Sequence, residues 1–460
     1  MPRRIWLKTL VSEKSAEASL NLAEALKAAL PPATLALLRA VAQQAERQGV
    51  ALYLVGGFVR DLLLGHPSLD LDLVVEGDAI RLGRSLAKRF GGQLTVHKRF
   101  GTAVWLIEEN KAHLLAKIKK VERKKFSSSQ LPDFLDLISA RRETYAHPGA
   151  LPVVEFSDLR QDQYRRDFTS NTLAVRLDGP HFGALLDPWG GLSDLRRGQL
   201  RVLHDRSFID DPTRILRILR LSARLHFQIE KHTLQLLKQA IKSLGQISGE
   251  RIRNELSIVL AEARRNQILL HVQKLGVLRA IHPNLRFGPK MAHSLARQPD
   301  SIPGVWELNE FSPSDFGFIL WFMHLSPQGV SRVAAHLRFS QPLQRASVAA
   351  ARLRPQLSSF ANLPPSQIVA RLEKEPLPAL YALYLENEKN KTGSLLLRYA
   401  KKWRHVQPRL DGHALRKKGL HPGPAYRHIL WRLRAAWLDG KVRTEKQERA
   451  LLEHLLDEHR

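Results

Sequence analysis

The sequence predicts an α+β fold, with an N-terminal mixed α/β head followed only by helical domains. Between residues 51 and 138, short apolar runs of buried-strand length are separated by turn residues and by one helical stretch. After Pro188 such runs nearly vanish, and apolar residues recur at helical intervals as far as Leu455. At roughly 150 residues per domain, the 460 residues suffice for about three domains.

Two helices are expected before the first strand. Residues 17–48 carry apolar side chains at helical spacing, and Pro31-Pro32 divides them, because proline cannot continue a helix. Five strands follow, at 51–55, 69–75, 94–96, 103–107 and 134–138, with a helix over 79–90. Further helices are expected over 214–225, 234–244 and 250–262, and the chain continues in this way to its end.

The chain is strongly basic, with 72 Lys and Arg against 44 Asp and Glu and a formal net charge of +28. This balance predicts a polyanionic partner. The basic residues are scattered along the chain, and no apolar run approaches the ~18 residues of a membrane span, so nucleic acid is favoured over a membrane surface. The absence of cysteine excludes disulfides and thiolate metal sites and fits a cytoplasmic protein.

Two aspartates on one predicted strand carry the strongest chemical signal. In the run from Leu69 to Leu73, residues two apart point to the same face, so Asp70 and Asp72 present their carboxylates side by side while the leucines enter the core. Such carboxylates repel each other unless a divalent cation lies between them. Oxygen ligands without Cys or a helical His pair favour Mg²⁺, with Mn²⁺ as the alternative.

A glycine turn precedes this pair. Gly56-Gly57 ends the first strand, and a helix is expected from about Phe58, with Arg60 one turn into it. Glycines let backbone amides approach a phosphate, and a helix N-terminus adds positive potential. Alone, Asp-x-Asp is usually a solvated edge strand and Gly-Gly an ordinary turn. Together, about a dozen residues apart, they indicate a metal-bound nucleotide site for phosphoryl or nucleotidyl transfer.

Five motifs in order resemble those of class II tRNA nucleotidyltransferases, the family of the CCA-adding enzymes, which is related to bacterial poly(A) polymerases and to CC-adding and A-adding enzymes. The resemblance covers residues 52–260 and reappears near the C-terminus. The motifs are Gly56-Gly57-x-Val59-Arg60-Asp61 with Asp70-x-Asp72, Tyr164-Arg165-Arg166-Asp167-Phe168-Thr169-x-Asn171, Asp187-Pro188-Trp189-Gly190-Gly191, Asp210-Asp211-Pro212-Thr213-Arg214-Ile215-Leu216-Arg217 and Glu250-Arg251-Ile252-Arg253-x-Glu255-Leu256.

The resemblance implies a magnesium-dependent enzyme that extends the 3′ end of tRNA with CTP and ATP. Asp70 and Asp72 would be catalytic and would bind the metal ions. Asp136, on the fifth strand, stands where the family often has an acidic residue near the metals, either as a third ligand or as the base that activates the primer 3′-hydroxyl. The residues expected to hold the triphosphate or the sugar are Gly57, Arg60 and Arg166.

A base-reading pair is expected in the fourth motif. Asp211 and Arg214 lie three residues apart, which would place an acceptor and a donor on one helix face. Such a pair can choose a nucleotide without a template, since each good bidentate contact gives about 1–3 kcal/mol of discrimination. Arg217 and Arg220 continue that face and are expected to meet phosphates. The alternative is an ordinary salt bridge on a helix, and the other motifs favour base recognition.

The resemblance also implies how the chain is divided. A helical extension (1–48) would precede the nucleotidyltransferase head (49–190), a neck that reads the base (191–270), a body (271–360) and a basic tail that binds the tRNA acceptor arm (361–460). Residues 391–460 alone carry 17 Lys and Arg against 7 Asp and Glu, which fits an RNA-binding surface that reaches the end of the chain.

Full CCA addition is the predicted activity. A complete loop over 140–152 argues against CC-only addition, and A-only addition or a poly(A) polymerase remains as the alternative with the same chemistry. The alternative of another class is a non-catalytic RNA-binding protein on the same scaffold. Residues 111–125 hold seven Lys and Arg and one Glu; a solvated arm is expected there, with a tRNA contact as the alternative.

Overall fold

The computed structural model divides the chain into two compact units, Met1–Ile247 and Ser248–Arg460, which are treated separately below. The structure describes residues 20–66, 70–122, 127–147, 149–150 and 152–458. Parts of some predictions therefore lie outside the described residues, namely 17–19 of the first helical stretch, Leu69 of the second strand, 123–125 of the basic insertion, Pro148 and Leu151 of the 140–152 loop, and 459–460 of the tail.

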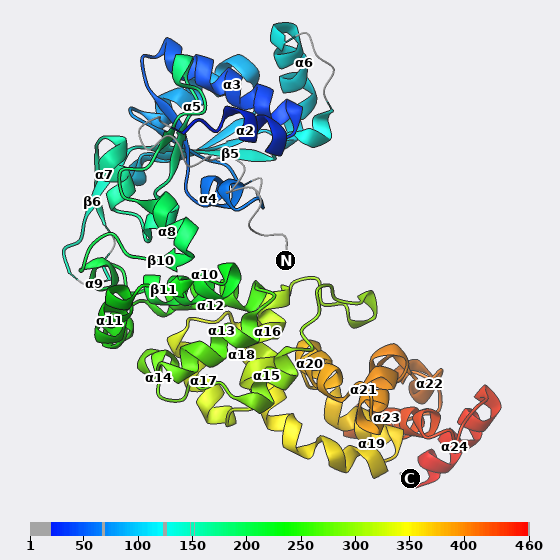
Figure 1. The fold of residues 1–460 in the computed structure, drawn as a ribbon. Helices are drawn as coiled ribbons and strands as arrows, with labels where there is room; N and C mark the ends of the chain where they lie inside the picture. The colour runs from blue at the N-terminus through cyan, green and yellow to red at the C-terminus, as the bar shows by residue number, and fades with distance from the viewer. Residues whose placement is uncertain (1–19, 67–69, 123–126, 148, 151, 459–460) are drawn as a thin grey trace. The chain divides into compact units, whose positions relative to one another are not determined.

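A seven-stranded mixed sheet forms the centre of the first unit (Figure 1). Its strand order is β3-β4-β5-β2-β1-β8-β9, and only β2 and β5 run parallel to each other. Two small sheets pair β6 with β7 and β10 with β11. The strands are β1 (Leu52–Val55), β2 (Asp72–Val75), β3 (Gln93–His97), β4 (Thr102–Leu106), β5 (Phe134–Ser139), β6 (Arg141–Thr144), β7 (Val153–Phe156), β8 (Ala174–Arg176), β9 (Leu185–Leu186), β10 (Gln199–Leu200) and β11 (Gln228–Ile229).

The helices of the first unit lie around this sheet and at its end. The long α3 and α5 pack against each other, and α5 also packs against β3, β4 and β5. The helices are α2 (Ala23–Ala29), α3 (Pro32–Arg47), α4 (Gly57–Leu63), α5 (Ala79–Phe90), α6 (Lys111–Glu122), α7 (Leu159–Tyr164), α8 (Gly191–Arg197), α9 (Ser207–Asp210), α10 (Arg214–Leu225) and α11 (Lys231–Ala240), joined in places by short 3-10 turns.

Alternation along β2 and β5 separates the core from a polar face. Leu73 and Leu137 are fully buried in the main hydrophobic core, which α3 and α5 share. Asp72 and Asp136 are each one residue away on the same strands, so they point to the opposite face. The predicted split between leucines inside and carboxylates outside is confirmed for the described positions. Asp70, however, precedes the strand, because β2 begins only at Asp72.

The predicted α+β class and the five predicted strands are confirmed, and α5 has the predicted bounds. The Asp78 side chain fixes the start of α5 by accepting hydrogen bonds from the backbone amides of Ile80 and Arg81. The division at Pro31-Pro32 is also confirmed, since α2 ends before it and α3 begins at Pro32. The remaining strands, from β6 to β11, were not predicted, because they are two to four residues long and lack an apolar run.

Residues 1–48 do not form a separate extension as far as they are described. Leu26 of α2 and Leu37 of α3 are fully buried in the same core as Leu54 of β1. Two amphipathic helices must bury their apolar faces, and here α4, α5 and α6 provide the surface. The boundary between the two units, after Ile247, also falls inside the predicted neck of residues 191–270.

The basic insertion is a packed helix and not the expected solvated arm. Its described part is α6, whose Leu114, Leu115 and Ile118 are buried in the main core. The Lys117 ammonium group donates a hydrogen bond to the Arg89 carbonyl at 2.5 Å. Although this segment is rich in charged residues, Leu114, Leu115 and Ile118 form an apolar stripe on one side of α6. This stripe packs the helix against α3 and α5.

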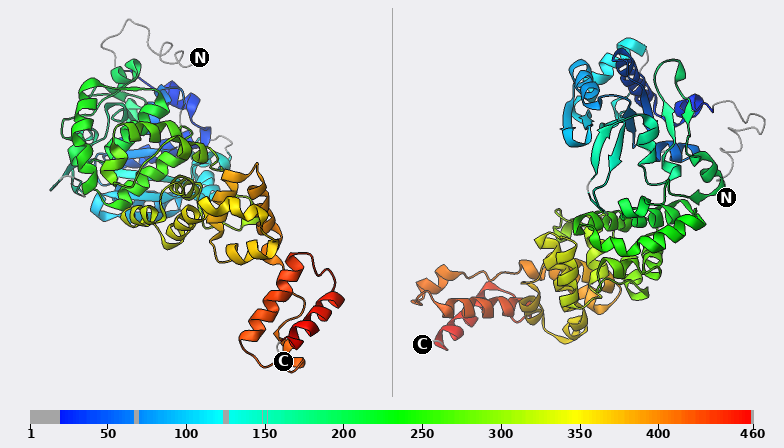
Figure 2. Two further views of the ribbon diagram at one scale, coloured as in Figure 1. Left: turned by 90° about the horizontal axis from the view of Figure 1, so that it is seen from below. Right: turned by 90° about the vertical axis from the view of Figure 1, so that its left-hand side faces the viewer.

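The second unit is helical throughout its described part, as predicted (Figure 2). Several of its helices begin with proline at their first positions, where the missing N–H costs nothing. They are α12 (Gly249–Ala261), α13 (Arg265–Lys274), α14 (Val277–Ile281), α15 (Pro289–Leu295), α16 (Pro313–Phe322), α17 (Pro327–His336), α18 (Gln341–Leu353), α19 (Pro365–Leu372), α20 (Leu377–Asn387), α21 (Lys391–Lys401), α22 (Gly412–Lys417), α23 (Pro424–Leu438) and α24 (Glu445–Asp457). Within the described ranges, no helix combines the length and the apolar character that crossing a bilayer requires.

The packing of α6 can be tested with Leu114→Ala. Since Leu114 is fully buried, we expect the substitution to lower the free energy of unfolding by about 2–5 kcal/mol, as large-to-small core changes do. His113→Ala, at an exposed position of the same helix, should change it by less than about 0.5 kcal/mol. Urea denaturation of both variants measures the difference. Equal small effects would mean that α6 is an unpacked arm after all.

Candidate active site

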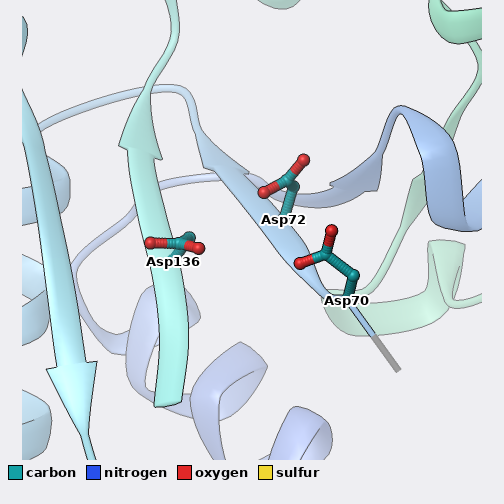
Figure 3. A group of neighbouring side chains, drawn as sticks. All are labelled: Asp70, Asp72 and Asp136. Carbon is teal, nitrogen blue, oxygen red and sulfur yellow. The ribbon is translucent and has the colours of Figure 1, made fainter. Parts of the chain in front are cut away.

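Three aspartates meet on one face of the central sheet (Figure 3). Asp72 of β2 and Asp136 of β5 are direct partners in the parallel pairing of these strands. Asp70 lies just before β2 and is exposed, whereas the other two are half-buried. One carboxylate oxygen from each residue lies within 4.8 Å of the other two. The structure therefore brings together the two predicted metal ligands and Asp136.

The acidic triad (Asp70, Asp72 and Asp136) carries more negative charge than its surroundings neutralise. Burial raises the pKa of Asp72 to about 6; Arg166 opposes this rise, and Asp70 and Asp136 add to it. Burial and the charge of Asp70 also raise the pKa of Asp136. A divalent cation held by one oxygen from each residue would relieve this repulsion, and an all-oxygen donor set suits Mg²⁺ or Mn²⁺. The residues present thus fit a divalent metal ion.

The glycine turn lies beside the triad and against Arg166. Gly56 follows β1 with φ of +73°, a conformation that favours glycine. A Cβ atom on Gly56 would lie 3.0 Å from Arg166 Nη1 and 3.7 Å from Asp72 Oδ2. Gly57 begins α4 directly after the turn. The missing side chain at Gly56 is therefore what lets a guanidinium group and a carboxylate approach the backbone here.

Arg166 is held in place by a fully buried carboxylate. Asp162 accepts a hydrogen bond from Arg166 Nη2 at 3.1 Å and from Arg165 Nη2 at 2.6 Å. Arg165 Nη1 also donates to Glu143 Oε1 at 3.1 Å. Arg165 is thus fully engaged within the protein, whereas Arg166 reaches the glycine turn with Nη1, and its buried Nε has no partner among the residues described. Of the two arginines, Arg166 is the one placed to meet a ligand.

Arg60 is placed differently from the expectation that it contacts a triphosphate. It is only 5% exposed, and its Nε and Nη2 donate to Asp61 Oδ1 and Oδ2 at 2.7 and 2.9 Å. Its Nη1 donates to Asn171 Oδ1 at 2.7 Å. Because these three donors are satisfied internally, Arg60 joins the first motif to the second and does not present a free phosphate-binding face.

These contacts belong to a larger polar ring between α4, the second motif and α10. Asn171 Nδ2 donates to Asp167 Oδ1 at 2.8 Å, and Arg217 Nη2 lies 2.7 Å from Asp167 Oδ2. Burial alone would raise the pKa of Asp167, but Arg217 and the Asn171 amide lower it overall. Arg224 Nη2 closes the ring 3.5 Å from Asp61 Oδ2. The members of the polar ring are Arg60, Asp61, Asn171, Asp167, Arg217 and Arg224.

The predicted base-reading pair does not share a helix face. α10 begins at Arg214, and Asp211 lies before it, where its Oδ1 accepts hydrogen bonds from the Thr213 amide at 3.1 Å and hydroxyl at 2.6 Å. Arg214 is 5% exposed and donates to Ser207 Oγ and to the Arg165 carbonyl, both at 2.6 Å. The prediction that Asp211 and Arg214 share a helix face was wrong, because it assumed that the helix already includes Asp211.

Arg217 and Arg220 do lie on α10, as expected. Arg217 is 41% exposed at its side chain and is held by Asp167. Sequence reasoning missed Arg224, although its position continues the spacing of Arg214, Arg217 and Arg220 along one helix face. It also missed Asp162 and Glu143, which hold the arginine pair; single acidic residues carry no signal of burial in a sequence.

Comparisons with known proteins identify the family of the chain. Residues 52–201 match the family model of the poly A polymerase head domain, and residues 226–287 match the model described as the probable RNA and SrmB-binding site of polymerase A. The A-adding tRNA nucleotidyltransferase of Halalkalibacterium halodurans is 32% identical over 435 residues, which cover 93% of each chain. That of Geobacter sulfurreducens is also 32% identical, over 93% of this chain, which spans only 48% of that relative.

Solved structures show the same fold along nearly the whole chain. The apo form II of a CCA-adding enzyme has a TM-score of 0.76 at 29% identity and covers 95% of this chain and 99% of that one. The Thermotoga maritima CCA-adding enzyme complexed with tRNA_CCA has a TM-score of 0.70 at 27% identity, covering 96% and 99%. The chain belongs to the class II tRNA nucleotidyltransferase family, as its motifs had indicated.

The role of Asp162 can be tested through pH. Burial alone would raise its pKa, but Arg165 and Arg166 lower it overall, so its contribution to stability is present above the ordinary Asp range and is lost as the pH falls through the lowered pKa. We expect Asp162→Asn to cost about 3–5 kcal/mol of unfolding free energy at pH 7, because it leaves buried charge unpaired. The difference in unfolding free energy between Asp162→Asn and the native protein should become smaller below about pH 4. Asp158→Asn, at the exposed start of α7, is the control and should cost less than about 0.5 kcal/mol, because Asn caps a helix as well as Asp does. A cost of Asp162→Asn that is independent of pH would refute the charge argument.

The fit of the triad to a divalent cation predicts metal-dependent stability. Adding Mg²⁺ or Mn²⁺ to EDTA-treated protein should raise the Tm, since a ligand that binds only the folded state stabilises it, with about 2–4 °C expected per kcal/mol for a unit of this size. Asp136→Asn should reduce this rise and should be more stable than the native chain in EDTA, because it removes one of the repelling charges. Glu109→Gln, an exposed acid elsewhere, should leave the rise unchanged. An equal rise in all three proteins would exclude the triad as the binding site.

Proposed function

We propose that the protein transfers nucleotides from CTP and ATP to the 3′ end of tRNA without a template. The observation that carries the proposal is the acidic triad beside a glycine turn and Arg166, within a head that belongs to this family. Catalysis of this kind rests on positioning and on compensation of charge, since little covalent chemistry is left to the protein.

The triad would hold Mg²⁺, which when bound supplies positive charge at the reacting phosphate and at the attacking and leaving oxygens. Asp70 and Asp72 are proposed as metal ligands and Asp136 as a third, since its oxygen lies as close as the others. Arg166 is proposed to bind the triphosphate, and the Gly56-Gly57 turn lets its backbone come close to it. Arg60 is proposed to position this turn through the polar ring and not to touch the substrate.

Base selection is proposed for the start of α10. Asp211 would accept from the edge of the incoming base. Arg214 would donate to it with the N–H groups that its bonds to Ser207 and to the Arg165 carbonyl leave over; Tyr145 and Glu143 lie nearby. Burial raises the pKa of Tyr145, with Glu143 as the next cause, so its hydroxyl keeps its proton and donates to Glu143 Oε2 at 2.8 Å. Arg217 and Arg220 would then face the phosphates. The second unit, with its basic tail, is proposed to bind the tRNA acceptor arm.

Two candidate activities differ in how many nucleotides the protein adds to the tRNA. Full CCA addition is proposed from the motifs, and the structural neighbours include CCA-adding enzymes complexed with ATP, with CTP and with tRNA_CCA. A-only addition is favoured by the relatives, because those from Geobacter, Halalkalibacterium and Aquifex aeolicus are all described as A-adding enzymes. Both candidates use the same triad.

One assay decides between them. Purified protein with Mg²⁺ is given tRNA that ends at the discriminator base, at CC or at CCA, together with CTP and ATP. A CCA-adding enzyme completes the first two; an A-adding enzyme extends only the CC-ended tRNA, by one AMP; a poly(A) polymerase extends all three. Asp70→Ala should lose at least about 10³-fold in rate, while tRNA affinity stays within twofold, because Asp70 is exposed and acts through the metal. No incorporation by the native chain would leave an RNA-binding protein as the function.

A further inference from the structure

A cavity of about 580 Å³ lies in the first unit, away from the triad, between the ends of α4 and α8 and the turn from α10 to β11. The residues proposed above to bind the metal or the nucleotide do not line it, although Asp61 of the polar ring forms part of its wall. The other charged or titratable side chains of its wall are His66, Arg196, Arg197, Arg224 and His226.

The charge of this cavity is strongly positive. Its wall holds three guanidinium groups, those of Arg196, Arg197 and Arg224, and one carboxylate, that of Asp61, which already accepts two hydrogen bonds from Arg60. Arg224 lies 3.5 Å from Asp61, and Arg197 donates to Ser193 Oγ at 2.9 Å. Arg196 is exposed and has no hydrogen bond or ion pair with any residue that the structure describes. Three guanidinium groups around one shared carboxylate leave an excess of positive charge that an anion would neutralise.

Two further observations separate this cavity from an ordinary solvated surface. Its floor is apolar, with Leu195 almost fully buried and Phe227 packed against the main core, so a ligand there would be partly shielded from water. His226 ends α10 with φ of +59°, a conformation that favours glycine. A histidine at this position keeps a hydrogen-bonding imidazole at the cavity, although glycine would suit the backbone better.

We propose that this cavity binds phosphate groups, with Arg196, Arg197 and Arg224 as the charged contacts and the imidazole rings of His66 and His226 as hydrogen-bond donors. Guanidinium groups match phosphate oxygens in geometry and charge. The phosphates have two possible sources, the backbone of a bound RNA or free pyrophosphate and nucleoside triphosphate. The proposal does not depend on chemistry at the triad.

The test uses the full chain and two variants of residues that take no part in the proposed catalysis, Arg196→Gln and His226→Gly. Binding of inorganic pyrophosphate and of tRNA is measured by calorimetry in EDTA, and tRNA binding is repeated over a range of salt concentrations. Arg84→Gln, an exposed arginine on α5 outside the cavity, is the matched control. Glycine adopts the backbone of His226 without strain, and the Tm of each variant is measured alongside, so that weaker binding is counted only for a variant that is folded at the temperature of the titration.

We expect both variants to weaken one ligand at least fivefold, while Arg84→Gln stays within twofold. If the source is RNA, the slope of log affinity for tRNA against log salt falls by about one for Arg196→Gln; if it is a free phosphate compound, only pyrophosphate binding weakens. The proposal is overturned if neither ligand is weakened beyond the control. Asp70→Asn should leave both affinities unchanged while it abolishes incorporation, so failure of this site and failure of the proposed function give different results.

Discussion

The mutual repulsion of three carboxylates is the constraint around which the first unit is organised. The parallel pairing of β2 and β5 sets Asp72 directly opposite Asp136, and the chain entering β2 adds Asp70. The backbone keeps Asp72 and Asp136 side by side, because Leu73 and Leu137 on the same two strands are buried in the core on the other face. The repulsion between the three carboxylates therefore destabilises the folded first unit. Arg166 offsets part of this repulsion, and a bound divalent cation would offset more of it.

The remaining parts of the site hold this charge balance in place. Asp162, fully buried beneath the two arginines, keeps Arg166 directed at the glycine turn. The polar ring links that turn, through Arg60 and Asn171, to Arg217 on α10. Buried and reciprocally bonded groups of this kind are rigid, because each would be left unsatisfied if one moved. Asp72 and Asp136 are therefore held by strands, and Arg166 is held by the buried Asp162.

The sequence predicted the parts that depend on local pattern. Alternation placed Asp70 and Asp72 on the polar face, and the proline pair divided α2 from α3. It did not predict that Arg60 is buried, because this depends on Asn171, a partner distant in the chain. It also placed the start of α10 too early, although the contacts of Asp211 with the Thr213 amide and hydroxyl there are local. The prediction of a solvated arm at α6 was also wrong. It rested on the number of charged residues, whereas Leu114, Leu115 and Ile118 are buried in the main core by contacts with segments distant in the chain.

The polar ring has a consequence for any attempt to redesign the protein. α10 carries the residues proposed to select the nucleotide, and the same helix anchors α4, which begins at the glycine turn, through Arg217 and Arg224. Substitutions on α10 are therefore expected to affect both the proposed nucleotide selection and the position of the glycine turn. A change of side chain on α10 therefore has to be assessed together with its partners Asp61 and Asp167.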